Sequence, residues 1–102
     1  MYIRGMDSKH LQDIYELSDG ELAGQLGERF REYRKALGLS QKQVSQSSGV
    51  SVMTIVRFET GQGNSIRLDN LIALMRALQR LDDIMGLVPE LPPSLYAKKK
   101  RR

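Results

Sequence analysis

The stretch SQKQVSQSSGVSVMTIVRFETG, Ser40 to Gly61, predicts two short helices joined by a tight turn. Ser40 begins the first helix as an N-cap, and Gln43 completes a capping box three residues later. Gly49 supplies the backbone freedom that a sharp turn between two crossed helices requires. Ser51 then caps the second helix, and the closing glycine ends it.

The second of these helices is expected to have an inner and an outer side. Ile55 and Phe58 are three residues apart and point towards the core. The outer side is formed by Val52, Met53, Val56 and Arg57. A helix of this size fits the major groove of DNA, while the helix before it crosses the DNA backbone.

This stretch resembles the helix-turn-helix of the Cro/cI-like (XRE-type) regulators, and the likeness extends from about Leu26 to Leu81. The residues that carry it are Arg34, the run Gly38-Leu39-Ser40-Gln41, Gly49, Ile55, the pair Phe58-Glu59 and Gly61. Two positions depart from the family pattern, because Ser45 replaces the usual alanine and Ser48 a usual apolar residue. The resemblance implies an all-α fold, a compact lambda-repressor-like bundle of about five short helices with a central helix-turn-helix and flexible tails.

The chain is expected to have three parts: an N-terminal extension over 1–17, the DNA-binding domain over 18–87, and a proline-containing basic tail over 88–102. In the extension, the spacing of Leu11, Ile14 and Tyr15 favours a short helix or turn docked on the core.

The domain begins with a second capping box, formed by Ser18 and Glu21. An amphipathic stripe follows, made of Leu22, Leu26, Phe30, Tyr33 and Leu37. Gly24 and Gly27 weaken a helix at this point, so we expect it to break into two helices there. Gly38 is its stop signal.

The segment from about Arg67 to Gln79 is expected to be helical and to carry two apolar stripes. One consists of Leu68, Leu71, Ile72, Met75 and Leu78, and the other of Leu74, Ala77 and Leu81. Two interpretations remain open: both stripes close one small core, or the second is a dimer seam. A short helix over 81–87 follows, and the three prolines of residues 88–94 prevent it from continuing.

Charge is distributed unevenly along the 102 residues, which carry a net charge of +4. Residues 29–80 hold nine basic and three acidic side chains, and the last five residues are all Lys or Arg. The positive charge therefore lies on the helix-turn-helix segment and the tail, as a surface that binds a polyanion requires.

Composition argues against catalysis and against a membrane or secreted location. The chain has no cysteine, no membrane-spanning apolar run and no signal peptide, so we expect a cytoplasmic protein. His10 is the only histidine, and no phosphate-binding loop, metal-ligand spacing or nucleophile motif is present. We expect no enzyme activity, no metal and no cofactor.

The DNA contacts can be assigned by chemistry. Arg57 is suited to guanine, because a guanidinium group can bond its O6 and N7 atoms together. Val52, Met53 and Val56 can contact thymine methyl groups, and Ser51 and Thr54 can bond a phosphate or a base edge. The candidate phosphate contacts are Gln41, Lys42, Thr60, Gln62 and Asn64. The resemblance implies DNA-contact roles for Gln41, Ser51, Val52, Met53 and Arg57. The alternative is that the apolar side chains form a patch for a protein partner.

The resemblance assigns Arg34 and Glu59 a structural role. In the family, the matching positions form an ion pair between the first long helix and the end of the recognition helix. A partly buried pair of this kind matters for stability before it matters for DNA specificity.

Several functions are compatible with the sequence. The first is a homodimeric repressor that binds a palindromic operator, since one short recognition helix makes too small a contact for high specificity. A sharper version is an antitoxin: residues 77–94 resemble the C-terminal part of HipB-like antitoxins, which repress their own operon and bind a HipA-type kinase toxin. The alternatives are a stand-alone small regulator and a protein-interaction (bridging) module on the same fold.

Overall fold

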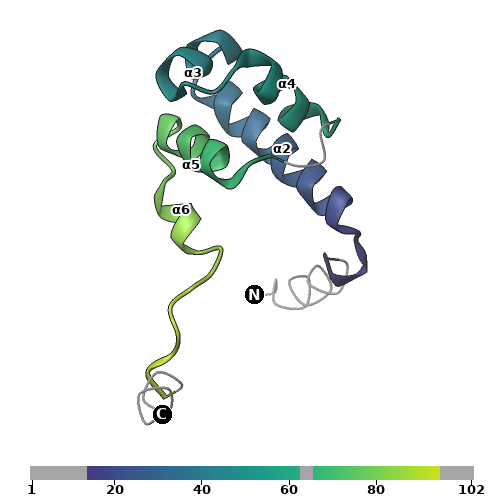
Figure 1. Cartoon of the computed structure of the whole chain (residues 1–102), viewed down its shortest axis with the longest axis vertical. Helices are drawn as coiled ribbons and strands as arrows, with labels where there is room; N and C mark the ends of the chain where they lie inside the picture. Colours follow the sequence, from purple (N-terminus) through teal and green to yellow (C-terminus); the bar gives the residue numbers. More distant parts are fainter. Residues whose placement is uncertain (1–13, 63–65, 95–102) are drawn as a thin grey trace.

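A computed structural model describes residues 14–62 and 66–94, and its regular structure is helical throughout that part of the chain (Figure 1). The helices are α2 (Asp19–Ala36), α3 (Gln41–Ser48), α4 (Val52–Thr60), α5 (Leu68–Ala77) and α6 (Asp82–Met85). The predicted all-α fold is confirmed. None of the helices in the described ranges is long and apolar enough to span a membrane.

The long helix α2 begins where the sequence predicts but does not break. Its capping box is present, with the Glu21 backbone N–H donating to Ser18 Oγ at 3.1 Å and the Ser18 N–H donating to Glu21 Oε1 at 2.8 Å. The predicted break near Gly24 and Gly27 is wrong, because α2 is continuous through both. Gly27 serves another purpose: it is buried where α2 crosses the backbone of α4 at Phe58.

The core draws one buried apolar side chain from each of α2 to α5, one from the turn between α3 and α4, and one from the residue that follows α5. The buried apolar residues are Phe30, Val44, Val50, Ile55, Leu74 and Leu78. Phe58 packs against this cluster from α4, with its ring centroid 5.5 Å from that of Phe30. Tilted aromatic pairs at this distance are favourable beyond their buried area. The core therefore holds α4 against α2 and leaves the opposite side of α4 open.

The apolar stripes predicted for α2 and α5 are buried to a different extent than expected. Of the stripe predicted for the first long helix, only Phe30 is buried, while Leu26, Tyr33 and Leu37 remain about half exposed. On α5 the predicted second stripe supplies the most buried residue, Leu74, and Leu68 of the first stripe is 63% exposed. The physical reason is the position of α3, which packs on the Leu74 side of α5. Leu74 therefore belongs to the core and is not available to a dimer seam; Ala77 packs against the same core, and Leu81 is half-buried.

The two ends of the described chain lie on the surface. Residues 14–16 are helical, but Tyr15 is exposed and does not dock on the core; Leu11 lies outside the described residues. The short helix expected over 81–87 is present as α6, which ends at Gly86. Residues 88–92 then run away from the helical body without regular structure (Figure 1). Helical conformation reappears at Pro93 and Ser94, and α6 itself has already ended before the first proline, Pro89.

Candidate nucleic-acid interface

The α3–turn–α4 unit is built by local side-chain and backbone signals. Ser40 Oγ accepts from the Gln43 N–H at 3.0 Å, and the Ser40 N–H donates to Gln43 Oε1 at 2.8 Å. Gly49 adopts the left-handed conformation with φ of +81°, which turns the chain sharply after α3. Ser51 Oγ accepts from the Thr54 N–H at 3.1 Å and begins α4. Each of these residues has the conformation that the sequence predicts.

Helix α4 has the two sides that were expected of it. Ile55 is completely buried on the inner side. On the outer side Val52 and Met53 are 40% and 58% exposed, Arg57 is exposed and Val56 is half-buried. Among the described residues, Arg57 makes no side-chain hydrogen bond or ion pair, so its guanidinium donors are available to a ligand. The outer side of α4 thus combines an available cation with apolar side chains.

The polar candidates differ in how far they are already bonded within the chain. The Ser51 hydroxyl donates to Thr54 Oγ1 at 2.9 Å, and the Thr60 hydroxyl donates to the Val56 carbonyl oxygen at 2.8 Å. Lys42 and Gln62 are exposed. Asn64 lies outside the described residues. These hydroxyl groups can still accept a hydrogen bond, while the exposed side chains are available for a phosphate.

A buried ion pair joins α2 to α4. Arg34 Nε donates to Glu59 Oε2 at 2.7 Å and Arg34 Nη2 donates to Glu59 Oε1 at 2.8 Å, with both residues about 5% exposed. Arg34 Nη1 also donates to the Leu39 carbonyl oxygen at 2.8 Å. The hydrogen bond to Glu59 raises the pKa of Arg34 above its ordinary value, against the opposing effect of burial. Two parallel bonds fix the relative position of the two helices.

Gln41 extends this ion pair to the start of α3, a contact that sequence reasoning missed. Its Nε2 donates to Glu59 Oε1 at 3.0 Å, although the residues are 18 positions apart. No local sequence signal indicates a contact over that separation. The Gln41 side chain is thus held by Glu59, while the first N–H groups of α3 remain available for a phosphate.

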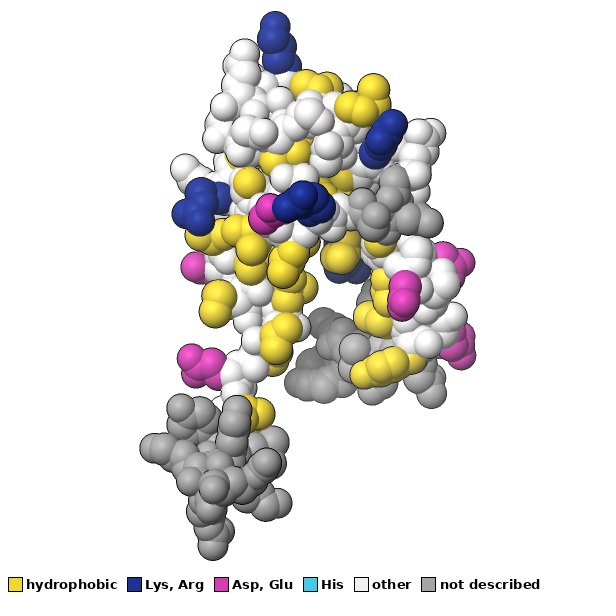
Figure 2. Space-filling model, viewed as in Figure 1, with side chains coloured by type: hydrophobic (Ala, Val, Ile, Leu, Met, Phe, Trp, Pro, Cys, Tyr) yellow, Lys and Arg dark blue, Asp and Glu magenta, His cyan; other side chains and the backbone are white. Residues whose placement is uncertain are grey.

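The surface of α3 and α4 is free of exposed negative charge. Glu59 is the only acidic residue of the two helices, and it is buried against Arg34. Arg31 lies beside it, with Nε 4.0 Å from Glu59 Oε1 and its side chain half exposed. In the space-filling view, the surface over α3 and α4 shows basic, apolar and uncharged side chains (Figure 2). This surface would attract a polyanion rather than repel it.

A comparison with known protein families finds one family whose model matches this part of the chain. The model of the helix-turn-helix family HTH_3 matches residues 30–83, more than half of the protein. The chain belongs to the helix-turn-helix family. Membership agrees with the predicted Cro/cI-like (XRE-type) resemblance and makes this helix-turn-helix protein a DNA-binding transcriptional regulator. No curated protein matches the chain.

Proposed function

We propose that this helix-turn-helix protein is a sequence-specific transcriptional repressor that binds a palindromic operator as a homodimer. The observation that carries the proposal is the outer side of α4. It presents the exposed guanidinium group of Arg57 beside the exposed Val52 and Met53, and the one acidic residue of α3 and α4, Glu59, is buried and paired with Arg34. An exposed arginine beside apolar side chains supplies both kinds of contact that are unique to the DNA major groove.

Each side chain of α4 has a distinct expected role. Arg57 would bond guanine O6 and N7, because the guanidinium fork matches these two acceptors. Val52, Met53 and Val56 would contact thymine methyl groups. Ser51 and Thr54 begin the helix and would bond a base edge or a phosphate.

The remaining contacts would position the protein on the DNA backbone. The start of α3 would present its first backbone N–H groups and the positive charge of the exposed Lys42, a combination that favours a phosphate. The other proposed phosphate contacts are Thr60, Gln62 and Asn64. These bonds carry no sequence information, but they orient α4 in the groove.

A homodimer is part of the proposal because α4 has only nine residues. One such helix reads a few base pairs, whereas two copies read half-sites about one helical turn of DNA apart. Selection from a pool of random duplexes tests this directly. The expected product is an inverted repeat with that spacing. A pool with no enriched sequence, or a single half-site, would contradict the proposal.

The finer proposal is that the repressor is an antitoxin of a HipA-type kinase toxin, repressing its own operon and neutralising the toxin by direct binding. It is supported by the resemblance of residues 77–94 to HipB-like antitoxins, and by exposed apolar residues such as Met85 that are not packed on the domain. Co-expression with the product of the neighbouring gene tests it. Co-purification and loss of kinase activity would support an antitoxin; a neighbour that neither binds nor phosphorylates protein would favour a stand-alone regulator.

A further inference from the structure

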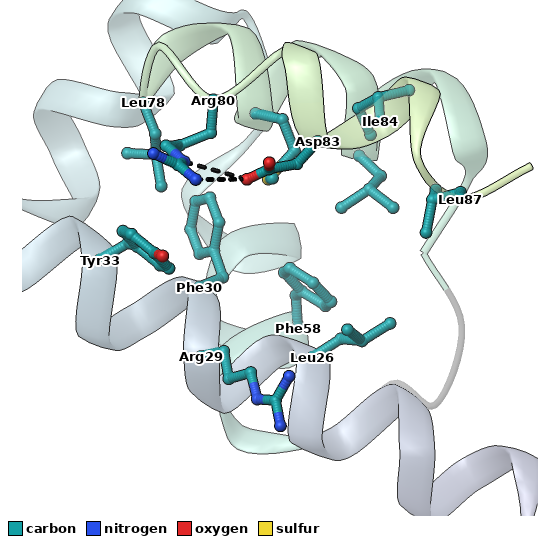
Figure 3. A pocket seen from close by; sticks show the side chains of 12 residues that line it. Leu26, Arg29, Phe30, Tyr33, Phe58, Leu78, Arg80, Asp83, Ile84 and Leu87 are labelled. Carbon is teal, nitrogen blue, oxygen red and sulfur yellow. Dashed lines mark hydrogen bonds and ion pairs between the residues drawn. The ribbon is translucent and has the colours of Figure 1, made fainter. Parts of the chain in front are cut away.

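An apolar groove lies between α2 and α6, on a different side of the core from the outer side of α4. It has a volume of about 310 Å³, and its wall includes Phe30, Tyr33, Phe58, Ile84 and Leu87, with Arg29 at the edge (Figure 3). Both phenylalanines of the protein line it. We call it the aromatic groove. In the space-filling view, hydrophobic side chains gather along α6 and the following segment, next to the hollow that separates them from α2 (Figure 2).

Two charged side chains at the groove, Arg80 and Asp83, are already paired with each other. Arg80 donates to Asp83 Oδ2 at 3.0 Å, and its guanidinium carbon lies 5.1 Å from the centre of the Tyr33 ring. These contacts brace the wall formed by α6 against α2 (Figure 3). Arg29 is different, because it makes no side-chain hydrogen bond or ion pair within the described part of the chain. The groove therefore offers aromatic surface and one available positive charge.

The segment that follows α6 has the complementary chemistry. Residues 88–92, Val-Pro-Glu-Leu-Pro, form what we call the arm. Val88 is 83% exposed and Leu91 is 44% exposed, so the arm leaves most of Val88 and nearly half of Leu91 open to solvent. Glu90 is the only charged residue of the arm. Proline-containing extended segments dock well in aromatic grooves, because their conformation is already restricted before binding.

We propose that the arm of one copy occupies the aromatic groove of a second copy, and the reverse, with Glu90 of each arm beside Arg29 of the other chain. The exchange is reciprocal, so it closes into a two-fold dimer and leaves no groove empty. It covers Val88 and Leu91 on one chain and the exposed face of Tyr33 on the other. It also gives the homodimer of the proposed function a contact surface on a different side of the core from the outer side of α4.

The backbone conformation after Leu87 keeps the arm out of the groove of its own chain. Leu87 lines the groove, and the arm begins at the next residue. A residue that precedes proline is held in an extended conformation, and both Val88 and Leu91 precede a proline. The chain therefore cannot reverse immediately after Leu87, and it runs outward instead (Figure 1). A second copy can supply an arm from the open side of the groove.

The first test is the mass of the full-length chain in solution, measured by sedimentation equilibrium. We expect a dimer, and we expect the double substitution Val88→Asp with Leu91→Asp to weaken it by more than about tenfold, since it places carboxylates against aromatic rings. Both positions are exposed, so the helical circular dichroism should not change. Leu68→Asp is the matched control, because Leu68 is 63% exposed and lies outside the groove; it should leave the mass unchanged.

The second test uses charge reversal to identify the occupant. Arg29→Glu alone and Glu90→Arg alone should each weaken the dimer, because each places like charges together. An equimolar mixture of the two single variants should form dimers again, since both exchanged contacts in the mixed dimer then pair opposite charges. If the mixture remains monomeric, while a chain that carries both Arg29→Glu and Glu90→Arg melts at a higher temperature than either single variant, the arm lies in its own groove and the proposal is wrong.

The outcomes also separate this inference from the proposed function. A wild-type chain that is monomeric in the absence of DNA, or a dimer unaffected by the arm substitutions, would overturn the inference. If operator selectivity persists in either case, the proposed function stands and another surface pairs the copies. If the arm substitutions behave as expected but no duplex is preferred, the interface stands and the proposed function fails. A toxin that binds the wild-type chain and leaves the dimer intact is compatible with both.

Discussion

Gly27 of α2 lies so close to the backbone of α4 that a Cβ atom built on it would stand 1.7 Å from the carbonyl oxygen of Phe58. The two helices touch through their backbones at this point. Helix α4 can therefore lie flat against α2, with Ile55 in the core and Arg57 on the outer side.

Gly27→Ala is expected to destabilise the protein by about 3 kcal/mol, the upper part of the range for overpacking, since backbone rather than a flexible side chain must move. Chemical denaturation measures the loss. Gly24→Ala is the matched control: it lies in the same helix with nothing within 4 Å of the added Cβ. That substitution should stabilise by up to about 1 kcal/mol through helix propensity. Equal effects of the two substitutions would show that the close contact is not maintained in solution.

Glu59→Ala is expected to lower stability by roughly 3–5 kcal/mol, because it leaves the buried Arg34 without its partner. Gln41 loses its acceptor in the same variant. Thermal unfolding measures the change, and Glu32→Ala, at an exposed position of α2, should stay within about 0.5 kcal/mol of wild type. A Glu59→Ala chain with an unchanged melting temperature and lost DNA binding would show that Glu59 acts on DNA rather than on the fold.

The ion pair at the start of α5 should make stability depend on acid pH. A hydrogen bond from Arg67 holds the pKa of Asp69 below its usual value of 3.8. A lowered pKa contributes stability that is present above the ordinary value and is lost as pH falls through the value in the folded protein. The difference in melting temperature between wild type and Asp69→Asn should therefore shrink below about pH 4. A difference that persists unchanged at lower pH would exclude this carboxylate as its cause.

Arg57→Ala is expected to cost about 1–3 kcal/mol on the operator and to relax the preference for guanine at one position of each half-site. Competition binding with operators altered at single base pairs measures both effects. Arg76→Ala removes an exposed guanidinium from α5 and is the control for a simple loss of charge. If Arg57→Ala weakens binding to every sequence equally, Arg57 contacts a phosphate instead.

Local features of this fold were predictable from sequence, because their causes lie within a few residues. The capping boxes at Ser18 and Ser40 each need only a partner three positions away. Gly49 and Gly61 adopt the left-handed conformation in the turns that follow their helices. The face of α4 that carries Arg57 follows from helical spacing alone.

Features that depend on distant contacts were not predictable in the same way. From its neighbours in sequence, Gly27 is expected to weaken the helix. Only its contact with Phe58 in the folded chain shows why a glycine is needed there. The spacing of apolar residues on α5 does not distinguish Leu68 from Leu74, because the neighbouring helix decides which of them is buried. The Arg34–Glu59 pair was expected from the family resemblance, whereas the bond from Gln41 became visible only in the folded chain.

Base-specific contacts of α4 are tested most directly by fluorescence anisotropy of labelled duplexes at several salt concentrations. One duplex carries DNA from upstream of the gene itself, and the other is a scrambled duplex of the same composition. We expect a large preference for the upstream duplex that persists as salt weakens binding to both duplexes, since ionic contacts to phosphate are common to the two. Equal and weak binding to both duplexes, falling together with salt, would contradict it and show that the outer side of α4 does not read sequence.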